Sequence, residues 1–181
     1  MGKKIAVITG SPRKKGNSFA MTDAFIDEAE ALGHEVSRFD AAFANLNGCH
    51  GCMTCYKTGK PCSFDDDFNT FADKILEADV VIFTTPVYWY DWPGQIKNAI
   101  DNMFCFAVAH KPIKDKSYAI IACCQESDPT VFDHIVGSFA RSAKLLNWDN
   151  LGNVLVTGVD ELGDIKNTDG EERARELARR I

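Results

Sequence analysis

The sequence lacks several features that would assign it to whole classes of protein. Its 181 residues contain no apolar run of membrane-spanning length and no hydrophobic secretory segment at the N-terminus, so we expect a cytoplasmic protein without a membrane partner. Positive charge is not in excess, since 20 Lys and Arg stand against 26 Asp and Glu, giving a net charge of -6. This balance argues against non-specific nucleic-acid binding.

Common catalytic motifs are absent as well. Gly10 and Gly16 do not have G-x-G-x-x-G spacing, and no Lys-Ser or Lys-Thr completes a nucleotide P-loop. The chain also has no serine nucleophile elbow, no His-Asp pairing and no C-x5-R phosphatase loop. These absences remove the common nucleophilic and nucleotide-hydrolysing classes, and no catalytic side chain is predicted.

What is present is an alternation of strand and helix patterns. With 45% hydrophobic residues and no internal repeat, the chain suits a single domain over residues 1–181. The run 80–84 shows no alternation of polar and apolar residues, as in a central strand buried on both faces. The predicted strands are 5–8, 35–39, 80–84, 118–123 and 151–156. The predicted helices are 19–32, one after 65–67, one from Pro93-Gly94 through Phe104, 132–146 and 170–181. This pattern predicts an α/β fold with a parallel sheet and helices on both faces.

A polar and basic turn separates the first strand from the first helix. It reads Thr9-Gly10-Ser11-Pro12-Arg13-Lys14-Lys15-Gly16-Asn17-Ser18. Unpaired N–H groups at a helix N-terminus, together with three cations and short polar side chains, favour a bound phosphate. The alternative is an ordinary capped helix behind a solvated basic turn.

A second unusual segment follows the central strand. Residues 85–92, Thr-Pro-Val-Tyr-Trp-Tyr-Asp-Trp, carry four aromatic side chains in five positions, and these cannot all face the core. A flat ligand would account for them, with an oligomer contact as the alternative, above all for Tyr90 and Trp92. Cys123-Cys124-Gln125 follow the fourth strand, where either backbone contacts to a ligand or two merely packed thiols are expected.

Residues 41–64 form a long loop rich in cysteine. Cys49, Cys52, Cys55 and Cys62 make a C-x-x-C-x-x-C-x6-C array, which suits a 4Fe-4S cluster better than structural zinc. Zinc with His50 as a ligand, and free or oxidised thiols, stay open as alternatives. Cys105 lies in an apolar helix and is expected to be a buried hydrophobe.

The basic turn resembles the Gly-Ser-x-Arg-x-x-Gly-Asn-Ser phosphate loop of the flavodoxin-like NAD(P)H-dependent FMN reductases. The resemblance implies that Ser11, Arg13, Asn17 and Ser18 hold the FMN phosphate. It further implies that the flavin ring is lined by Thr85, Pro86, Val87, Tyr88 and Trp89, and that the ring approaches the backbone of Cys123. The expected fold is a doubly wound, three-layer α/β/α sandwich with a five-stranded sheet of order 2-1-3-4-5. In that order the loops after strands 1, 3 and 4 should form one site.

The cysteine array is similar to that of the iron-sulfur flavoproteins, a branch of the same family in which a cluster passes electrons to FMN. Three functions follow. The first is an FMN-dependent oxidoreductase that takes hydride from NAD(P)H and reduces a flavin, quinone or other small acceptor. The second is an electron-transfer protein that exchanges electrons with ferredoxin through a 4Fe-4S cluster and FMN. The third is a non-catalytic module that uses the aromatic segment for protein contacts. Exposed aromatic residues near the site also predict a homodimer or homotetramer.

Overall fold

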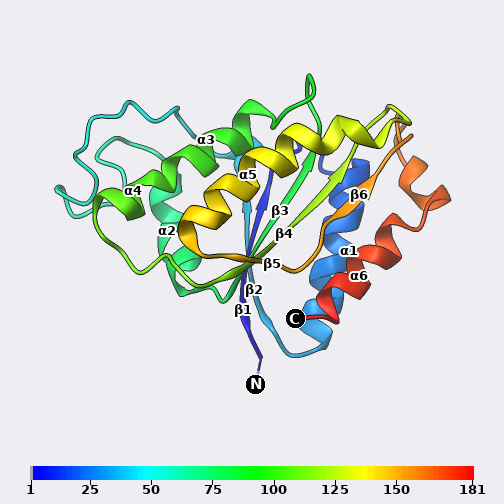
Figure 1. Ribbon diagram of the computed structural model, residues 1–181, viewed down its shortest axis with the longest axis horizontal. Helices are drawn as coiled ribbons and strands as arrows, with labels where there is room; N and C mark the ends of the chain where they lie inside the picture. Colours follow the sequence, from blue (N-terminus) through cyan, green and yellow to red (C-terminus); the bar gives the residue numbers. More distant parts are fainter. Residues whose placement is uncertain (1) are drawn as a thin grey trace.

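Parallel strands form one sheet with helices on both of its faces (Figure 1). The structure is a computed structural model that describes residues 2–181, so residue 1 of the predicted domain lies outside the described residues. The strands are β1 (Lys4–Thr9), β2 (Glu35–Asp40), β3 (Val80–Pro86), β4 (Ser117–Cys123), β5 (Asp149–Asn150) and β6 (Val154–Val156). Their order is β2-β1-β3-β4-β5, and β6 also pairs with β4. The predicted fold class and strand order are confirmed.

Two layers of helices cover the sheet. The α-helices are α1 (Asn17–Ala31), α2 (Phe68–Glu77), α3 (Gly94–Asn102), α4 (Phe104–Val108), α5 (Asp133–Leu146) and α6 (Gly170–Ala178). Short 3-10 turns are η1 (Ala41–Phe43), η2 (Pro129–Phe132) and η3 (Asp164–Asn167). Helices α1 and α6 pack together on one face, and α2 to α5 lie on the other (Figure 1).

Each central strand supplies side chains to both cores. Along β1, Ile5 and Val7 join the core under α1 and α6, whereas Ala6 and Ile8 join the core under α2 to α5. Because successive side chains of a strand point to opposite faces, an uninterrupted apolar run is what a strand covered on both sides requires. The run 80–84 is buried for the same reason.

The fifth strand differs from the prediction. Instead of one strand over residues 151–156 there are two short ones, β5 and β6, both paired with β4. Between them Gly152 has a φ of +100°, and its N–H donates to Asn150 Oδ1 (2.8 Å). Asn153 Oδ1 accepts the Ile120 N–H (3.0 Å), so a side chain replaces the backbone carbonyl that would accept this N–H in a continuous strand. A turn over residues 151–153 thus replaces the first half of the predicted strand, and the sheet has six strands within residues 2–181 rather than five.

The helix predicted from Pro93 through Phe104 is also interrupted. Helix α3 ends at Asn102, and a tighter turn, in which the Phe106 N–H donates to the Met103 carbonyl (3.1 Å), begins α4. Asn102 is buried, and its side chain donates to the Asn47 carbonyl (3.3 Å). Phe104, predicted to face the core, is about half exposed. The break therefore places Phe104 at the edge of the cysteine-rich loop.

Candidate functional site

The turn after β1 is packed closely against β3. The Gly10 N–H donates to the Thr84 carbonyl (2.8 Å), and a β-carbon on Gly10 would lie 2.7 Å from Thr85 Oγ1 and 2.8 Å from Ile96 Cγ2. Thr85 and Ile96 are fully buried, so neither can move aside cheaply. The glycine therefore holds the turn at the edge where the strands end.

The N-terminus of α1 has no side-chain cap. Ser11 is buried, and its Oγ accepts a hydrogen bond from the Arg13 N–H (3.1 Å) within the turn. The first N–H groups of α1 keep the partial positive charge of a helix start, and the exposed Arg13 adds a full charge. An ordinary capped helix does not describe this terminus, and an anion suits it.

Asn17 opens α1 but faces a segment far away in the sequence. Its Nδ2 donates to the Glu161 carbonyl (3.0 Å), and its Oδ1 accepts from the N–H of Gly163 (3.0 Å) and Ile165 (3.4 Å). We call residues 157–165, which follow β6, the strap. Through Asn17 the strap is tied to the basic turn of residues 9–18, a connection that the sequence did not indicate.

The segment after β3 forms a tight hairpin, the green loop at the top of Figure 1. Tyr88 and Asp91 exchange two backbone hydrogen bonds of 3.0 Å, and between them Trp89 and Tyr90 both have positive φ, +50° and +66°. Positive φ strains aromatic residues, so other contacts must hold the turn. One is the Tyr90 hydroxyl, which donates to Glu126 Oε1 (2.7 Å). Trp89 is 95% exposed.

Two residues of the aromatic segment lie away from the surface it forms. Thr85 is fully buried, and its hydroxyl donates to the Pro86 carbonyl (2.8 Å). Trp92, for which a ligand or oligomer contact was expected, is only 6% exposed and belongs to the core. Its Nε1 donates to Ser138 Oγ (3.1 Å). The interpretation of Trp92 as a surface residue is wrong, because α5 provides both an apolar contact with Phe139 and a hydrogen-bond acceptor, Ser138, for the indole.

The loop after β4 forms the opposite wall. The Cys123 carbonyl accepts the Val87 N–H (3.1 Å), which joins this loop to the aromatic segment. Burial raises the pKa of the Cys123 thiol to about 12, so that thiol stays neutral. Gln125 Nε2 donates to Asp160 Oδ2 (3.0 Å) of the strap. The β4 loop is thus tied to both of its neighbours.

These segments enclose a cleft of about 460 Å³ at the carboxyl ends of the strands. Every cofactor-binding residue predicted from the sequence lines it except Thr85. They are Ser11, Arg13, Asn17, Ser18, Pro86, Val87, Tyr88, Trp89 and Cys123. Cys124 and Gln125, which follow Cys123 in the predicted β4 loop, line it too, and Val159 and Asp160 of the strap were not predicted. An uncapped helix start at one end and aromatic walls at the other fit the phosphate and the ring of FMN.

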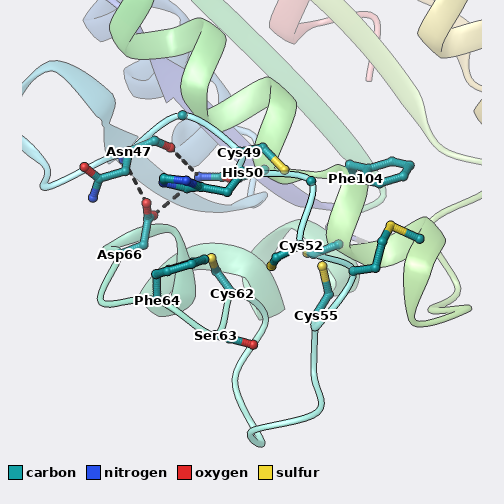
Figure 2. Close-up of a pocket in the computed structure, with 15 residues that line it drawn as sticks. Asn47, Cys49, His50, Cys52, Cys55, Cys62, Ser63, Phe64, Asp66 and Phe104 are labelled. Carbon is teal, nitrogen blue, oxygen red and sulfur yellow. Dashed lines mark hydrogen bonds between the residues drawn. The ribbon is translucent and has the colours of Figure 1, made fainter.

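The cysteine-rich loop forms a separate pocket (Figure 2). Cys49, Cys52, Cys55 and Cys62 all line it, and the buried Cys105 lies at its base. The pocket has an accessible volume of about 30 Å³, which is room for about two water molecules. Within residues 2–181, no three His, Cys, Asp or Glu side chains are gathered closely enough to hold a metal ion. Four thiols of one loop are suitable donors for an iron-sulfur cluster, but the loop must rearrange to hold one.

The thiols of this pocket differ in their surroundings. The Thr54 hydroxyl, 3.0 Å from Cys52 Sγ, and the Thr54 backbone lower the pKa of Cys52 by stabilising its thiolate. Burial raises the pKa of Cys55, and it raises that of Cys105 to about 12. His50 stacks on the Phe64 ring with centroids 4.8 Å apart. Cys105 is buried as predicted, but it also lines the pocket.

A buried carboxylate anchors both ends of the cysteine-rich loop. Asp66 Oδ2 accepts the Asn47 N–H (2.8 Å) before the cysteines, and its Oδ1 accepts the Phe68 N–H (2.9 Å) after them. Asn102 of α3 also donates to the Asn47 carbonyl and lies 3.5 Å from Asp66 Oδ1. Figure 2 shows Asn47 and Asp66 joined beside the pocket. The sequence predicted only that a helix follows residues 65–67, and it did not indicate this anchoring role of Asp66.

Known proteins resemble this chain in sequence and in fold. An iron-sulfur flavoprotein of Archaeoglobus fulgidus is 36% identical over 115 residues, covering 64% of this chain and 51% of that protein. The chain thus spans about half the length of this relative. An iron-sulfur flavoprotein of Methanocaldococcus jannaschii is 29% identical over 185 residues, covering 98% of this chain and 95% of the relative.

Solved structures confirm the architecture. An NAD(P)H:quinone oxidoreductase from Methanothermobacter marburgensis superposes with a TM-score of 0.79 at 15% identity, over 99% of this chain and 96% of that one. An azoreductase from Bacillus anthracis gives 0.74 at 21% identity over the full length of both chains. At such identities the likeness shows the fold alone. No helix within residues 2–181 combines the length and apolar character needed to cross a membrane.

A family match over most of the chain identifies the family. Residues 3–130 match the family of NADPH-dependent FMN reductases, and this range contains the basic turn, the cysteine-rich loop, the aromatic hairpin and the β4 loop. The strap and the last helix lie beyond it. This chain belongs to the NADPH-dependent FMN reductase family of flavin-dependent oxidoreductases.

Proposed function

We propose that the protein is an FMN oxidoreductase that is reduced by NADH or NADPH and passes the electrons to a small acceptor such as a flavin or a quinone. The observation that carries this proposal is the cleft, which joins an uncapped helix start, Arg13 and an aromatic hairpin at one edge of the sheet. When bound, FMN supplies the redox chemistry by accepting a hydride equivalent and returning two electrons.

The protein residues bind and orient this cofactor. The first N–H groups of α1 and the Arg13 guanidinium hold the phosphate, and Ser11 and Ser18 line the same end of the cleft. Pro86, Val87 and Tyr88 form the wall beside the ring. Because the Asn17 amide is bonded to the strap, we assign Asn17 to positioning the strap over the phosphate end as well as to lining the cleft.

In this proposal the nicotinamide nucleotide and the acceptor meet the flavin ring one after the other, at the ring end of the cleft. No G-x-G-x-x-G motif offers the nicotinamide nucleotide a second site, so the donor must leave before the acceptor enters. The test is purification with FMN, followed by anaerobic titration with NADPH and with NADH and by steady-state kinetics. We expect bleaching of the flavin absorbance and parallel double-reciprocal plots. A flavin that binds tightly but is reduced by neither nucleotide would refute the proposal, as would a ternary complex of both substrates.

A second candidate function has its own observation in its favour. Four thiols of one loop line one pocket, and the relatives described above are named iron-sulfur flavoproteins. In this alternative Cys49, Cys52, Cys55 and Cys62 hold a 4Fe-4S cluster that exchanges electrons with FMN and with a carrier such as ferredoxin.

Iron analysis separates the two functions. Protein prepared without oxygen should contain about four irons per chain and absorb broadly in the visible range if the cluster exists. Cys52→Ser should then lose the iron and keep FMN. Wild-type protein free of iron after anaerobic purification excludes the second function and leaves the first intact.

A further inference from the structure

The flavin cleft continues into a second hollow on the far side of Trp89. This hollow, which we call the annex, has a volume of about 280 Å³. It shares Val87, Trp89, Cys124 and Gln125 with the cleft. Its own lining residues are Tyr90, Glu126 and Val131. A molecule in the annex would therefore lie next to the end of the cleft that Val87 and Trp89 form, where the flavin ring is proposed to bind, and away from the basic turn of residues 9–18.

One wall of the annex is an aromatic hairpin whose backbone is held in place. The hairpin of Tyr88 to Asp91 closes with two backbone hydrogen bonds of 3.0 Å, and both of its tip residues, Trp89 and Tyr90, have positive φ. Such a conformation persists only where surrounding contacts impose it. The tip is held to the β4 loop by the bond from the Tyr90 hydroxyl to Glu126. The backbone of Trp89 is fixed in this way, and its indole, which is nearly fully exposed, offers a stacking surface to a flat molecule.

The annex contains one charge. Burial, followed by the proximity of Glu126, raises the pKa of Cys124, and the hydrogen bond to Glu126 raises the pKa of Tyr90, so both side chains are neutral near pH 7. Glu126 is thus the one acidic side chain among the seven that line the annex, and none of the seven is basic. Its backbone is fixed too, because its carbonyl accepts the Gly158 N–H (2.9 Å) and the Cys124 thiol (3.3 Å).

The cleft and annex together are electrically polarised. Arg13 and the start of α1 make the phosphate end positive, while Glu126 places a negative charge in the annex. An anionic molecule is therefore attracted to one end and repelled from the other. Since FMN occupies the positive end with its own phosphate, a second substrate meets the negative end.

We propose that the annex receives the electron acceptor, and that Glu126 makes it select neutral or cationic planar acceptors of the quinone type over anionic ones. The inference rests on the proposed function and names its acceptor class. Reduction of a quinone consumes two electrons and two protons: the reduced flavin gives a hydride equivalent, solvent gives the second proton, and the hydroquinone leaves. Glu126 takes no part in this transfer and acts as a specificity-determining residue.

The experiment compares three naphthoquinones that share one ring system and differ in charge: an uncharged one, a sulfonate and a trimethylammonium derivative. Bound FMN is photoreduced, so that no nicotinamide nucleotide is needed, and its reoxidation by each quinone is followed in a stopped-flow instrument. For each quinone the rate of a variant is divided by that of the wild type, which cancels differences in quinone potential. Failure of the flavin to be photoreduced or to bind would count against the proposed function, not against the annex.

In Glu126→Gln we expect the ratio for the sulfonate to rise about threefold or more and that for the cationic quinone to fall by a similar factor. Glu126→Lys should enlarge both changes. The uncharged quinone should respond least, and all differences should shrink at about 1 M salt, where the Debye length is about 3 Å. Glu30→Gln, which removes an exposed carboxylate near the end of α1 opposite the cleft, is the matched control and should show no charge-dependent change.

Equilibrium binding gives a readout that does not depend on turnover. The oxidised holoprotein cannot reduce a quinone, so its dissociation constants for the three compounds can be measured by calorimetry. They should change in the same order as the reoxidation rates. Equal ratios for all three quinones in Glu126→Gln would overturn the proposal. So would a variant in which only the KM for NADPH falls, because the annex would then serve the donor.

Discussion

The flavin cleft and the cysteine pocket lie at the same edge of the sheet but are built in opposite ways. The cleft is formed by short loops that leave β1, β3 and β4 directly, and hydrogen bonds connect each loop to the next. The cysteine pocket lies in a long loop after β2, and two of its four array thiols are exposed. A site on strand ends is preformed by the fold, whereas a site on a long loop is completed by what it binds.

The largest expected difference between the two regions is in thiol reactivity. At pH 8 the Cys123 thiolate, whose pKa is raised from 9.0 to about 12, should be about a thousandfold scarcer than that of an ordinary cysteine. Cys52, whose pKa is lowered, should react fastest with iodoacetamide in metal-free protein. As the pH falls from 9 to 7, Cys52 should keep its reactivity longest, because a lowered pKa keeps the thiolate populated.

Mass spectrometry of the alkylated peptides checks this order. Thr54→Val removes the hydroxyl that stabilises the thiolate, so it should raise the pKa of Cys52 and slow its alkylation at pH 7. In concentrated urea all seven cysteines should react alike, which is the control for burial. Fast labelling of Cys123 in the native protein would show that the cleft is not preformed.

The next largest effect concerns the anchor of the cysteine-rich loop. Asp66→Asn puts an amide where a buried carboxylate accepts the N–H groups of Asn47 and Phe68, and we expect a loss of about 2 kcal/mol of stability. If the loop holds iron, iron should be lost too, while the affinity for FMN stays within about twofold. Asp65→Asn, on an exposed neighbour, is the matched control. Denaturant unfolding measures the stability, iron analysis the iron content and FMN titration the affinity for FMN. Loss of FMN together with iron would mean that the two regions are not independent.

A substitution in the turn after β1 should instead weaken FMN binding. The β-carbon in Gly10→Ala would come within 3 Å of Thr85 and Ile96, so we expect a loss of about 1–2 kcal/mol in stability and weaker FMN binding. Gly137→Ala in α5 meets no atom within 4 Å and should be neutral or stabilising by up to about 1 kcal/mol. Urea unfolding with and without FMN measures both. Equal stabilities of the two variants would contradict the close packing.

The sequence predicted features that depend on neighbouring residues better than features that depend on distant ones. The strand order and the cleft depend on apolar runs and on a turn whose residues are adjacent in sequence. Such local patterns can be recognised in the sequence alone. The strap is not, because Asn17 meets residues 161–165 only after the whole chain has folded. Trp92 was misjudged since its partner Ser138 lies 46 residues away. The split of the fifth strand depends on side-chain bonds of Asn150 and Asn153 that no periodicity records.

The smallest expected effect tests the phosphate end of the cleft alone. Arg13→Gln removes one exposed charge, and we expect its FMN dissociation constant to rise about tenfold, because a charged hydrogen bond to phosphate is lost. Riboflavin has the same ring without the phosphate, so the same substitution should change its affinity by less than about twofold. Lys14→Gln is the control, since Lys14 Nζ lies 4.7 Å from the Phe43 ring centroid rather than at the cleft wall. Flavin fluorescence quenching measures all the constants. If riboflavin weakened as much as FMN, Arg13 would be acting on the ring or on the fold, and the phosphate would have to be bound elsewhere.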